Sequence, residues 1–593
     1  MDNLNLEKVV SFDPKVDVEE TFRPKEVIYK SGINKSRYAV NADSYSDSSI
    51  QWNSIVPPSF QTVVERALRV QYVVQITSTY TSAGATVANS PYFPAIDTRD
   101  GGGTLYSPTF SGCLRDWPLQ QCCSGIDLKI NGMNTSTSPS DWISVFSHIV
   151  DENELNRYCA EFPCQKDNNA VYSLPNPLAV VDAPTLNNLR SPFIPYSQNT
   201  NLPSRASFLG KLISSTNAGG KTTDVYQFTI TEQLIVSPCT WGNGIDNGMG
   251  LSNISSIQLN IKLDNLNRAV SVCPGALAGA NTIAITMSAV KPVLLVEYIT
   301  PDPVMSARQP AELVYGYETI QTDFTTNQIV GWNNATALNS YTGVANSIRL
   351  GAIPDKIFIY IRPSKSSLAG NAKLAQSMPS IFLRITNLSL NFNNRISLFN
   401  TYTEADLYKM SVANGLKDDF HAWKYGGCCV IIIDVAKDIQ LEPQQVAGQA
   451  NSYMTLTPTL TFDPSPLVYS GQAQACNYDI YTVCTQTGKA VISKNACQFM
   501  LTAPNGEEVL QATTDPNAKV DNSELVVLGK AQGGSIFSKG MKLLHRGLAV
   551  AKTVAKHVKP EHLEMASNAL DSLGLGGQVA GGKLHKKAHK RVY

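Results

Sequence analysis

Short stretches of alternating apolar and polar residues recur through residues 60–510, and this pattern restricts the possible folds more than any other feature. Val70, Tyr72 and Val74 alternate with Arg69 and Gln71. The same period of two recurs at 126–130, 257–263 and 283–287. Successive side chains of a β-strand point to opposite faces of a sheet, so the alternation predicts strands with one buried face.

Two further stretches, 356–362 and 429–435, are almost continuously apolar. Such runs predict strands that are covered on both faces. Clusters of Pro, Gly, Asn and Asp separate the strands, and helical patterning is scarce before residue 530. The sequence therefore predicts an all-β body built from antiparallel sandwiches.

The chain is too long for a single hydrophobic core, because 593 residues exceed the usual size of one domain. A proline-containing seam, Thr300-Pro301-Asp302-Pro303, divides the β-rich body into two parts of similar size. We predict two tandem sandwiches with the following boundaries: N-terminal arm 1–50, first sandwich 51–300, linker 301–311, second sandwich 312–515, second linker 516–534, and tail 535–593.

The chemistry of the chain changes at Gly533-Gly534. Residues 535–593 hold eleven Lys and Arg against three Asp and Glu, and five of the seven histidines. The whole chain has 48 residues of each charge and is formally neutral, so the body before the glycine pair is acidic. A basic segment on an acidic body indicates a separate partner that carries phosphate groups, either nucleic acid or lipid.

The tail has a helical period instead of the strand period. Its apolar residues recur at spacings of three and four between residues 536 and 559, which predicts one amphipathic helix with a basic flank. The apolar stripe comprises Phe537, Met541, Leu544, Leu548, Ala551, Ala555 and Val558. The basic face comprises Lys542, Arg546, Lys552, Lys556 and Lys559. Such a helix can pack on its own body, lie on a membrane surface, or bind a polyanion and partner chains.

Charged residues are only 16% of the chain, where about a quarter is usual. Surfaces rich in Ser, Thr, Asn and Gln suit close contacts between subunits, because no stranded charge must lose its water there. The first twenty residues carry acids before any apolar run, so we expect no signal peptide. We therefore expect the twelve cysteines to be mostly buried thiols in a reducing compartment.

The sequence contains no recognisable catalytic motif. Only His148 and His421 lie in the body, and we expect structural roles for both. The doublets Cys122-Cys123 and Cys428-Cys429 are poor metal motifs, because adjacent cysteines rarely bind one ion and no Cys-x-x-Cys spacing occurs. The sequence thus predicts no catalytic residue, no metal site and no cofactor.

Two glycine pairs share the pattern small or apolar, any residue, Gly-Gly. One is Gly533-Gly534 followed by Ser535, and the other is Gly581-Gly582 followed by Lys583. A Gly-Gly pair is slim and flexible enough to enter a narrow protease cleft as an extended strand. The pairs are therefore candidate processing sites, and the alternative is that they are plain linkers.

Several short motifs occur in an order and spacing that resemble a known family. The second half has Ile-Pro-Asp-Lys-Ile-Phe-Ile at 353–359, Leu-Ser-Leu-Asn-Phe-Asn-Asn at 388–394, Asp-Leu-Tyr at 406–408, and the stretch 414–423 ending in Trp423. This half resembles the second jelly roll of major capsid proteins from virophages, Polinton-like viruses and adintoviruses. In the first half, 55–59, 62–66, 231–234 and Ser237-Pro238 resemble elements of the same family.

This resemblance implies a double jelly-roll fold and a structural, non-enzymatic function. The implied protein is the major capsid protein of a small double-stranded DNA virus, located in the virion and assembled in the cytoplasm or nucleus of the host. It implies a homotrimer that forms a pseudo-hexameric tile, packs with other trimers into an icosahedral shell, and meets a penton (minor capsid) protein. A viral maturation cysteine protease of the adenovirus type is implied to cut after Gly534, with Gly582 as a second site. The tail is expected to contact viral DNA, lipid or scaffold.

Two alternatives remain open from the residues alone. One is a carbohydrate-active enzyme with two sandwiches, which would need paired acids in a cleft. The other is a glycan-binding attachment protein. Neither alternative explains the basic tail and its glycine-flanked start.

Overall fold

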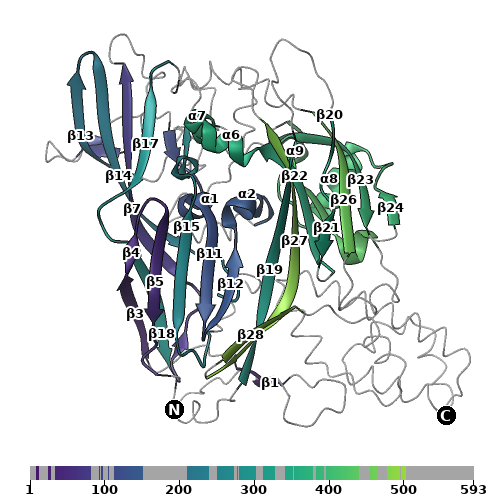
Figure 1. Ribbon diagram of the computed structural model, residues 1–593, viewed down its shortest axis with the longest axis horizontal. Helices are drawn as coiled ribbons and strands as arrows, with labels where there is room; N and C mark the ends of the chain where they lie inside the picture. Colours follow the sequence, from purple (N-terminus) through teal and green to yellow (C-terminus); the bar gives the residue numbers. More distant parts are fainter. Residues whose placement is uncertain are drawn as a thin grey trace, which may run out of the picture. The chain divides into compact units, whose positions relative to one another are not determined.

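The computed structural model describes the strand-rich body of the chain (Figure 1). The described residues are 34–81, 112–150, 210–239, 250–301, 312–327, 341–439, 454–463 and 477–501, with short gaps inside these ranges, and a few isolated short strands. Two of those, β1 (Val9–Ser11) and β2 (Lys25–Val27), pair antiparallel with each other and belong to the smaller of two compact units. All other described strands belong to a second, larger unit.

The strands from β3 to β18 form the first sandwich. The order in its larger sheet is β3 (Asn34–Asn41), β18 (Val293–Thr300), β7 (Arg69–Thr81), β14 (Lys221–Gln233), β13 (Gly210–Ala218), β8 (Ala95–Asp97) and β9 (Thr104–Leu105). Two further strands join this sheet outside that order. Strand β17 (Thr282–Met287) pairs with β7, and β6 (Val63–Val64) pairs with β18. The facing sheet has the order β12 (Met133–Thr137), β11 (Cys123–Ile130), β15 (Ile257–Leu263), β5 (Ser49–Ile55) and β4 (Ser44–Tyr45). A separate pair joins β10 (Gly112–Leu114) to β16 (Val270–Val272).

The strands from β19 to β28 form the second sandwich. In one sheet β19 (Glu312–Asn327), β27 (Tyr478–Ser493), β22 (Lys356–Pro363) and β25 (Ile431–Asp434) follow in that order, and β28 (Ala496–Leu501) pairs with β27. The other sheet has the order β20 (Tyr341–Val344), β26 (Met454–Asp463), β23 (Arg384–Phe392) and β24 (Arg395–Leu398), with β21 (Ile348–Leu350) beside β26. Within each sandwich the pairing is antiparallel except between β8 and β13.

The helices of the described residues are short. They are α1 (Pro118–Cys122), α2 (Pro139–Ile149), α6 (Lys365–Gly370), α7 (Ala372–Ser377), α8 (Glu404–Ala413) and α9 (Phe420–Tyr425), with a 3₁₀ turn η6 (Leu266–Ala269) and a π turn η8 (Val435–Ile439). No helix among the described residues is long and apolar enough to cross a membrane.

The strands expected from the sequence pattern are present. In β7 the side chains of Val70, Tyr72 and Val74 are buried, whereas Arg69 and Gln71 are half-buried, as the alternation predicts. The apolar runs became β22 and β25, which are buried on both faces and pair with each other. An all-β body of antiparallel sandwiches is therefore confirmed.

One boundary differs from the expectation, and the cysteines agree with it. The strand β3, which falls inside the expected arm 1–50, pairs along its whole length with β18. The first sandwich therefore begins by Asn34, because β18 would otherwise have an open edge. The seven cysteines whose side chains the structure describes are buried and in no disulfide, in agreement with the expectation of buried thiols.

Candidate functional site

The residues that the sequence analysis singled out in the tail lie outside the described residues. This holds for both glycine pairs, Gly533-Gly534 and Gly581-Gly582, and for the apolar stripe and basic face of the tail helix. The described part of the chain instead presents a different site, the buried contact between the two sandwiches.

Helix α2 of the first sandwich lies at the centre of this contact. Pro139 opens the helix, at a position where the missing N–H costs no hydrogen bond. Asp141 follows in the first turn, where the unpaired amides of the helix favour a carboxylate. Ser140 and Asp141 are both buried. Their polar groups therefore need hydrogen-bond partners inside the protein.

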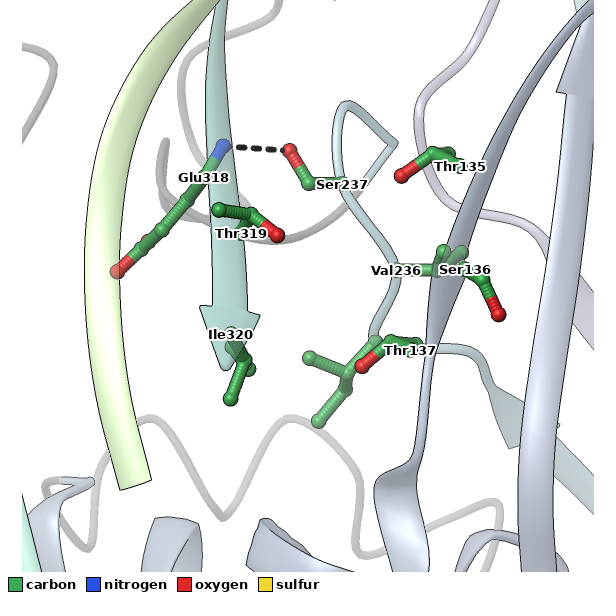
Figure 2. Close-up of a pocket in the computed structure, with 9 residues that line it drawn as sticks. Thr135, Ser136, Thr137, Val236, Ser237, Glu318, Thr319 and Ile320 are labelled. Carbon is green, nitrogen blue, oxygen red and sulfur yellow. Dashed lines mark hydrogen bonds between the residues drawn. The ribbon is translucent and has the colours of Figure 1, made fainter. Parts of the chain in front are cut away.

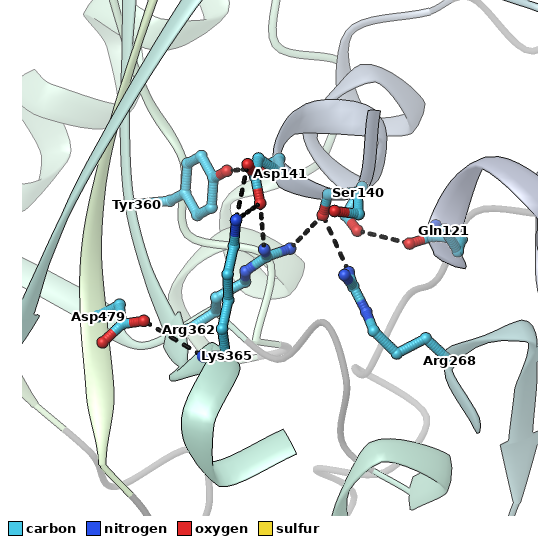
Figure 3. A network of polar contacts seen from close by, with 9 residues as sticks. Gln121, Ser140, Asp141, Arg268, Tyr360, Arg362, Lys365 and Asp479 are labelled. Atoms are coloured by element: carbon cyan, nitrogen blue, oxygen red, sulfur yellow. Dashed lines mark hydrogen bonds and ion pairs between the residues drawn. The ribbon is translucent and has the colours of Figure 1, made fainter. Parts of the chain in front are cut away.

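Strand β22 and helix α6 of the second sandwich provide those partners (Figure 3). Nη1 of Arg362 donates to the carbonyl oxygen of Ser140 at 2.9 Å, and Nη2 lies 3.4 Å from Oδ1 of Asp141. Nζ of Lys365 lies 2.7 Å from the same carboxylate oxygen. The hydroxyl of Tyr360 donates to the carbonyl oxygen of Asp141. The buried carboxylate is thus shared by two cations.

Arg362 is fully buried, and its guanidinium is held on both its edge and its face. Its Cζ lies 4.3 Å from the centre of the Tyr481 ring, and that ring stacks on Tyr360 at 5.1 Å with an interplanar angle of 4°. Arginine suits this position, because its planar group can pair with a carboxylate and stack on an aromatic ring together. A buried charge held in this way tolerates little displacement.

A second guanidinium, that of Arg268, reaches the same carbonyl oxygen of Ser140 from within the first sandwich, at 3.0 Å. Burial, and repulsion by the nearby Arg362 and Arg115, lower the pKa of Arg268 to about 9. Arg268 is thus charged at neutral pH, and the N-terminus of α2 gathers positive charge around one carboxylate. The carboxylate of Asp141 offsets the charges of Arg362 and Lys365 in this arrangement.

Glu232, in one of the motifs that carry the family resemblance, positions the neighbouring helix α1. It is buried at the end of β14, and its carboxylate accepts from the amides of Leu119 and Gln120 at 2.9 and 3.1 Å. The hydroxyl of Tyr72 and the side-chain amide of Gln120 also donate to it, each at 2.9 Å. Burial raises the pKa of Glu232 to about 7, although these four hydrogen bonds favour the charged carboxylate and lower the pKa. The motif residue thus has a structural role.

Ser237, from the Ser-Pro motif, contributes to the contact at another point (Figure 2). Its Oγ accepts from the backbone amide of Glu318 in β19 at 2.8 Å, while the side chain of Glu318 points away from Thr135 and Ser136. The cavity lined by β12, residues 235–237 and β19 measures about 10 Å³, which is the space of a single water. It is too small for a sugar or another substrate.

More hydrogen bonds close the contact around this cavity. Three of them join Asn131 Nδ2 to the carbonyl of Ser493 at 2.8 Å, Thr135 to the Tyr317 hydroxyl at 2.9 Å, and the Ser252 amide to the Tyr315 hydroxyl at 2.8 Å. The two sandwiches therefore meet through a packed, hydrogen-bonded and charge-paired surface. Such a paired polar surface holds the two sandwiches in one relative orientation.

Sequence reasoning missed the residues of this contact. Arg362 gave one usable signal in the sequence, because it directly follows the apolar run 357–361. A charged residue at the end of a buried strand must be paired. Nothing in the sequence indicated that the partner is Asp141. Of the two histidines in the body, His148 lies buried in α2, with Nδ1 2.6 Å from Oδ2 of Asp418.

Two antiparallel sandwiches in one chain, joined by a closed polar contact, define a protein of the double jelly-roll class. A family model described as Sputnik virophage major capsid protein 1st domain matches residues 5–299, and one described as Major capsid protein V20 C-terminal domain matches residues 317–428. The chain belongs to the major capsid proteins of the virophage type.

Individual relatives agree with this assignment. The capsid protein V20 of Sputnik virophage is 23% identical over 581 residues, which cover 92% of this chain and 87% of the relative. A chain of the cryo-EM structure of the Sputnik virophage matches with a TM-score of 0.66 at 20% identity, over 87% of this chain and 96% of that one. The mavirus major capsid protein matches with a TM-score of 0.60 at 12% identity, over 80% and 92%.

These comparisons confirm the resemblance to virophage capsid proteins and the double jelly-roll fold. The chain is a structural component of a virion capsid and not an enzyme. The two alternatives, a carbohydrate-active enzyme and an attachment protein, are therefore set aside.

Proposed function

We propose that three copies of the chain form a trimer whose six sandwiches make a pseudo-hexameric tile, and that these tiles pack into the icosahedral shell of a small double-stranded DNA virus. The observation that carries this proposal is the buried ion pair between Asp141 and Arg362, which joins the two sandwiches of one chain. A tile of six equivalent positions requires such a joint, because each chain must present its two sandwiches at a constant angle.

The surface of the body supports close packing between subunits. Several large apolar side chains are exposed, among them Ile396 at 76% and Val56 at 64%, together with Val290 and Val344. Only 16% of all residues are charged, so a lateral contact can form with few charges losing their water. Association with further trimers and with a penton protein at the vertices follows from the same proposal.

The tail has a separate proposed task. A viral cysteine protease would cut between Gly534 and Ser535 after assembly, with the bond after Gly582 as a second site. The charge of 535–593, eleven basic against three acidic residues, supports contact with DNA or an anionic lipid surface while the tail is attached. Its helical stripe would serve as a scaffold between subunits. Assembly would take place in the cytoplasm or nucleus of the host.

The domain boundaries proposed from the sequence follow the same scheme. The first jelly roll would extend to residue 300 and the second from 312 to 515, with linkers at 301–311 and 516–534. The strand β18 ends at Thr300 and β19 begins at Glu312, which supports this division.

Light scattering coupled to size-exclusion chromatography on the full chain and on residues 1–534 tests the assembly. We expect a trimer from the shorter chain, and closed particles in negative stain only when the tail is present. Monomers from both chains at every salt concentration would contradict the proposal.

Cleavage is tested by coexpressing the full chain with the protease of its virus and measuring the mass of the product. Gly534→Val should abolish the cut before Ser535, whereas Gly582→Val should leave that cut intact. An unchanged product from Gly534→Val would show that the site lies elsewhere.

A further inference from the structure

Three side chains with metal-binding atoms meet at the far end of α2 from the Asp141 ion pair. His148 comes from the last turn of α2, Asp418 from the connection between α8 and α9, and Cys428 from the residues just before β25. All three are buried, and their ligand atoms lie within 4.8 Å of one another. The cluster therefore lies on the contact between the two sandwiches, because α2 belongs to the first and the other two residues to the second.

Backbone hydrogen bonds hold these residues in place. The amide of Lys417 donates to the carbonyl oxygen of His148 at 2.9 Å, which keeps the segment of Asp418 against α2. The amide of Phe382 donates to the carbonyl oxygen of Gly427 at 2.8 Å, next to Cys428, and the Phe382 ring packs edge-on against the imidazole with centroids 5.6 Å apart. The cluster is thus positioned by the fold before any ion arrives.

We propose that His148, Asp418 and Cys428 bind one Zn²⁺ ion that joins the two sandwiches. An imidazole, a carboxylate and a thiolate form a donor set that zinc prefers, and a water or a neighbouring group completes the tetrahedron. Nδ1 of His148 and Oδ2 of Asp418 are 2.6 Å apart. They would separate to about 3.5 Å around the ion, since zinc–ligand distances are about 2.0–2.3 Å. The Cys428 thiol would release its proton to solvent on binding.

This site could not be found from motif spacing. His148 and Asp418 are separated by 270 positions, whereas known zinc motifs place at least two ligands within a few residues of each other. The adjacent cysteines Cys428 and Cys429 are a poor metal motif only if both thiols face the same point. The structure separates the two thiols: Sγ of Cys429 accepts from the amide of Ile385 in β23 at 3.3 Å.

The two cysteines therefore provide a matched pair of variants. Full-length protein is stripped with a chelator, dialysed, and titrated with Co²⁺ as an optical probe for zinc. We expect one equivalent to bind with a cobalt–thiolate absorption band in the wild type and in Cys429→Ser. Cys428→Ser should lose the band and bind more than about tenfold more weakly, because even partners of metal ligands contribute tenfold to affinity.

The band is needed because five histidines in the tail can bind cobalt without a thiolate. Zinc should also raise the melting temperature of the wild type and of Cys429→Ser, and should leave that of Cys428→Ser unchanged. A wild type that shows no cobalt–thiolate band, or an equal band in Cys428→Ser, would overturn the proposal.

A measurement on the wild type alone covers the case in which Cys428→Ser does not fold. X-ray absorption of the zinc-loaded protein should show one sulfur and nitrogen or oxygen ligands around the ion. A zinc shell without sulfur would equally refute the site. These outcomes are independent of whether the chain forms trimers, so failure of the metal site leaves the assembly proposal intact.

Discussion

Asp141 and Arg362 are separated by 221 positions in the chain, yet they form a buried ion pair with Oδ1 and Nη2 3.4 Å apart. Asp141 belongs to the first sandwich and Arg362 to the second. The pair lies where a helix N-terminus meets the end of a strand, and Lys365 reaches the same carboxylate. A charge pair in this position makes the orientation of the two jelly rolls sensitive to single substitutions.

Removal of the Asp141 carboxylate should therefore be costly. In Asp141→Asn the buried guanidinium of Arg362 loses its countercharge, and we expect the free energy of unfolding to fall by about 3–5 kcal/mol. Urea unfolding monitored by tryptophan fluorescence measures the change. Lys262→Met, which breaks the exposed pair with Asp127, is the control and should cost less than about 1 kcal/mol. Equal effects of the two variants would contradict the role given to Asp141.

Glu232 should make stability depend on pH. Its pKa is raised by burial from 4.5 to about 7, so the folded state holds the proton more tightly than the unfolded state. The contribution of this pKa shift to the free energy of unfolding is fully present below about pH 4.5 and is lost as the pH rises through about 7. The difference is about 3 kcal/mol from the pKa shift. Glu232→Gln has no titrating group, so its unfolding free energy minus that of the wild type should increase across this interval. A difference that stays constant with pH would show that Glu232 does not titrate there.

The edge strand β3 should depend on Glu297 of β18. This carboxylate lies 2.7 Å from Nζ of Lys35 and accepts from Nε of Arg37 at 2.9 Å. A hydrogen bond with Glu65, then the contacts with these two cations, hold the pKa of Glu297 below its ordinary value. In Glu297→Gln we expect faster amide hydrogen exchange confined to β3, because most of its side chains are exposed and bury little apolar surface.

Lys409→Met serves as the comparison for that experiment, since this residue lies in α8, outside the first sandwich. It should leave exchange in β3 at the wild-type rate. Protection of β3 that is unchanged in Glu297→Gln would show that backbone pairing alone retains the strand.

Gly250 should tolerate no larger residue. A Cβ atom there would lie 2.0 Å from Cγ1 of Val63 and 3.0 Å from the carbonyl oxygen of Val64. Val64 and Leu251 exchange backbone hydrogen bonds of 2.8 and 2.7 Å. Neither segment of the backbone can therefore move away without breaking these bonds. We expect Gly250→Ala to lower the free energy of unfolding by about 1–3 kcal/mol.

Gly370, at the end of α6, is the matched control, because no atom from outside its own stretch of helix lies within 4 Å of a Cβ placed there. Gly370→Ala should be neutral or stabilise by up to about 1 kcal/mol, since alanine loses less backbone entropy on folding. Thermal unfolding of both variants measures the contrast, and similar melting temperatures would contradict it.

Most of the strands could be predicted from the sequence because their signal is local. The alternation around Tyr72 and the apolar runs at β22 and β25 reflect which side of each strand faces the core. The short helices were harder. Helix α2 spans only eleven residues, and its polar stripe of Ser140, Asp141, Ser144, Ser147 and His148 is buried instead of facing solvent.

The site depends on long-range pairing and was not predicted. Arg362 is recognisable as a charge in an apolar strand, and Glu232 as part of a motif, but neither sequence position indicates a partner. The cluster of His148, Asp418 and Cys428 requires the docking of α2 onto the second sandwich before its atoms meet. A residue's neighbours in space follow from the topology of the sheets, which local patterns do not encode.

The sequence by itself determined the fold class, the family resemblance and the contrast between an acidic body and a basic tail, because periodicity, motif order and charge are properties of residue order. Only the tertiary structure decided that Asp141 pairs with Arg362, that Glu232 supports α1, and which member of a cysteine doublet faces a histidine. Those outcomes depend on distances between strands and helices that are remote in the chain, and such distances exist only once the two sandwiches have packed.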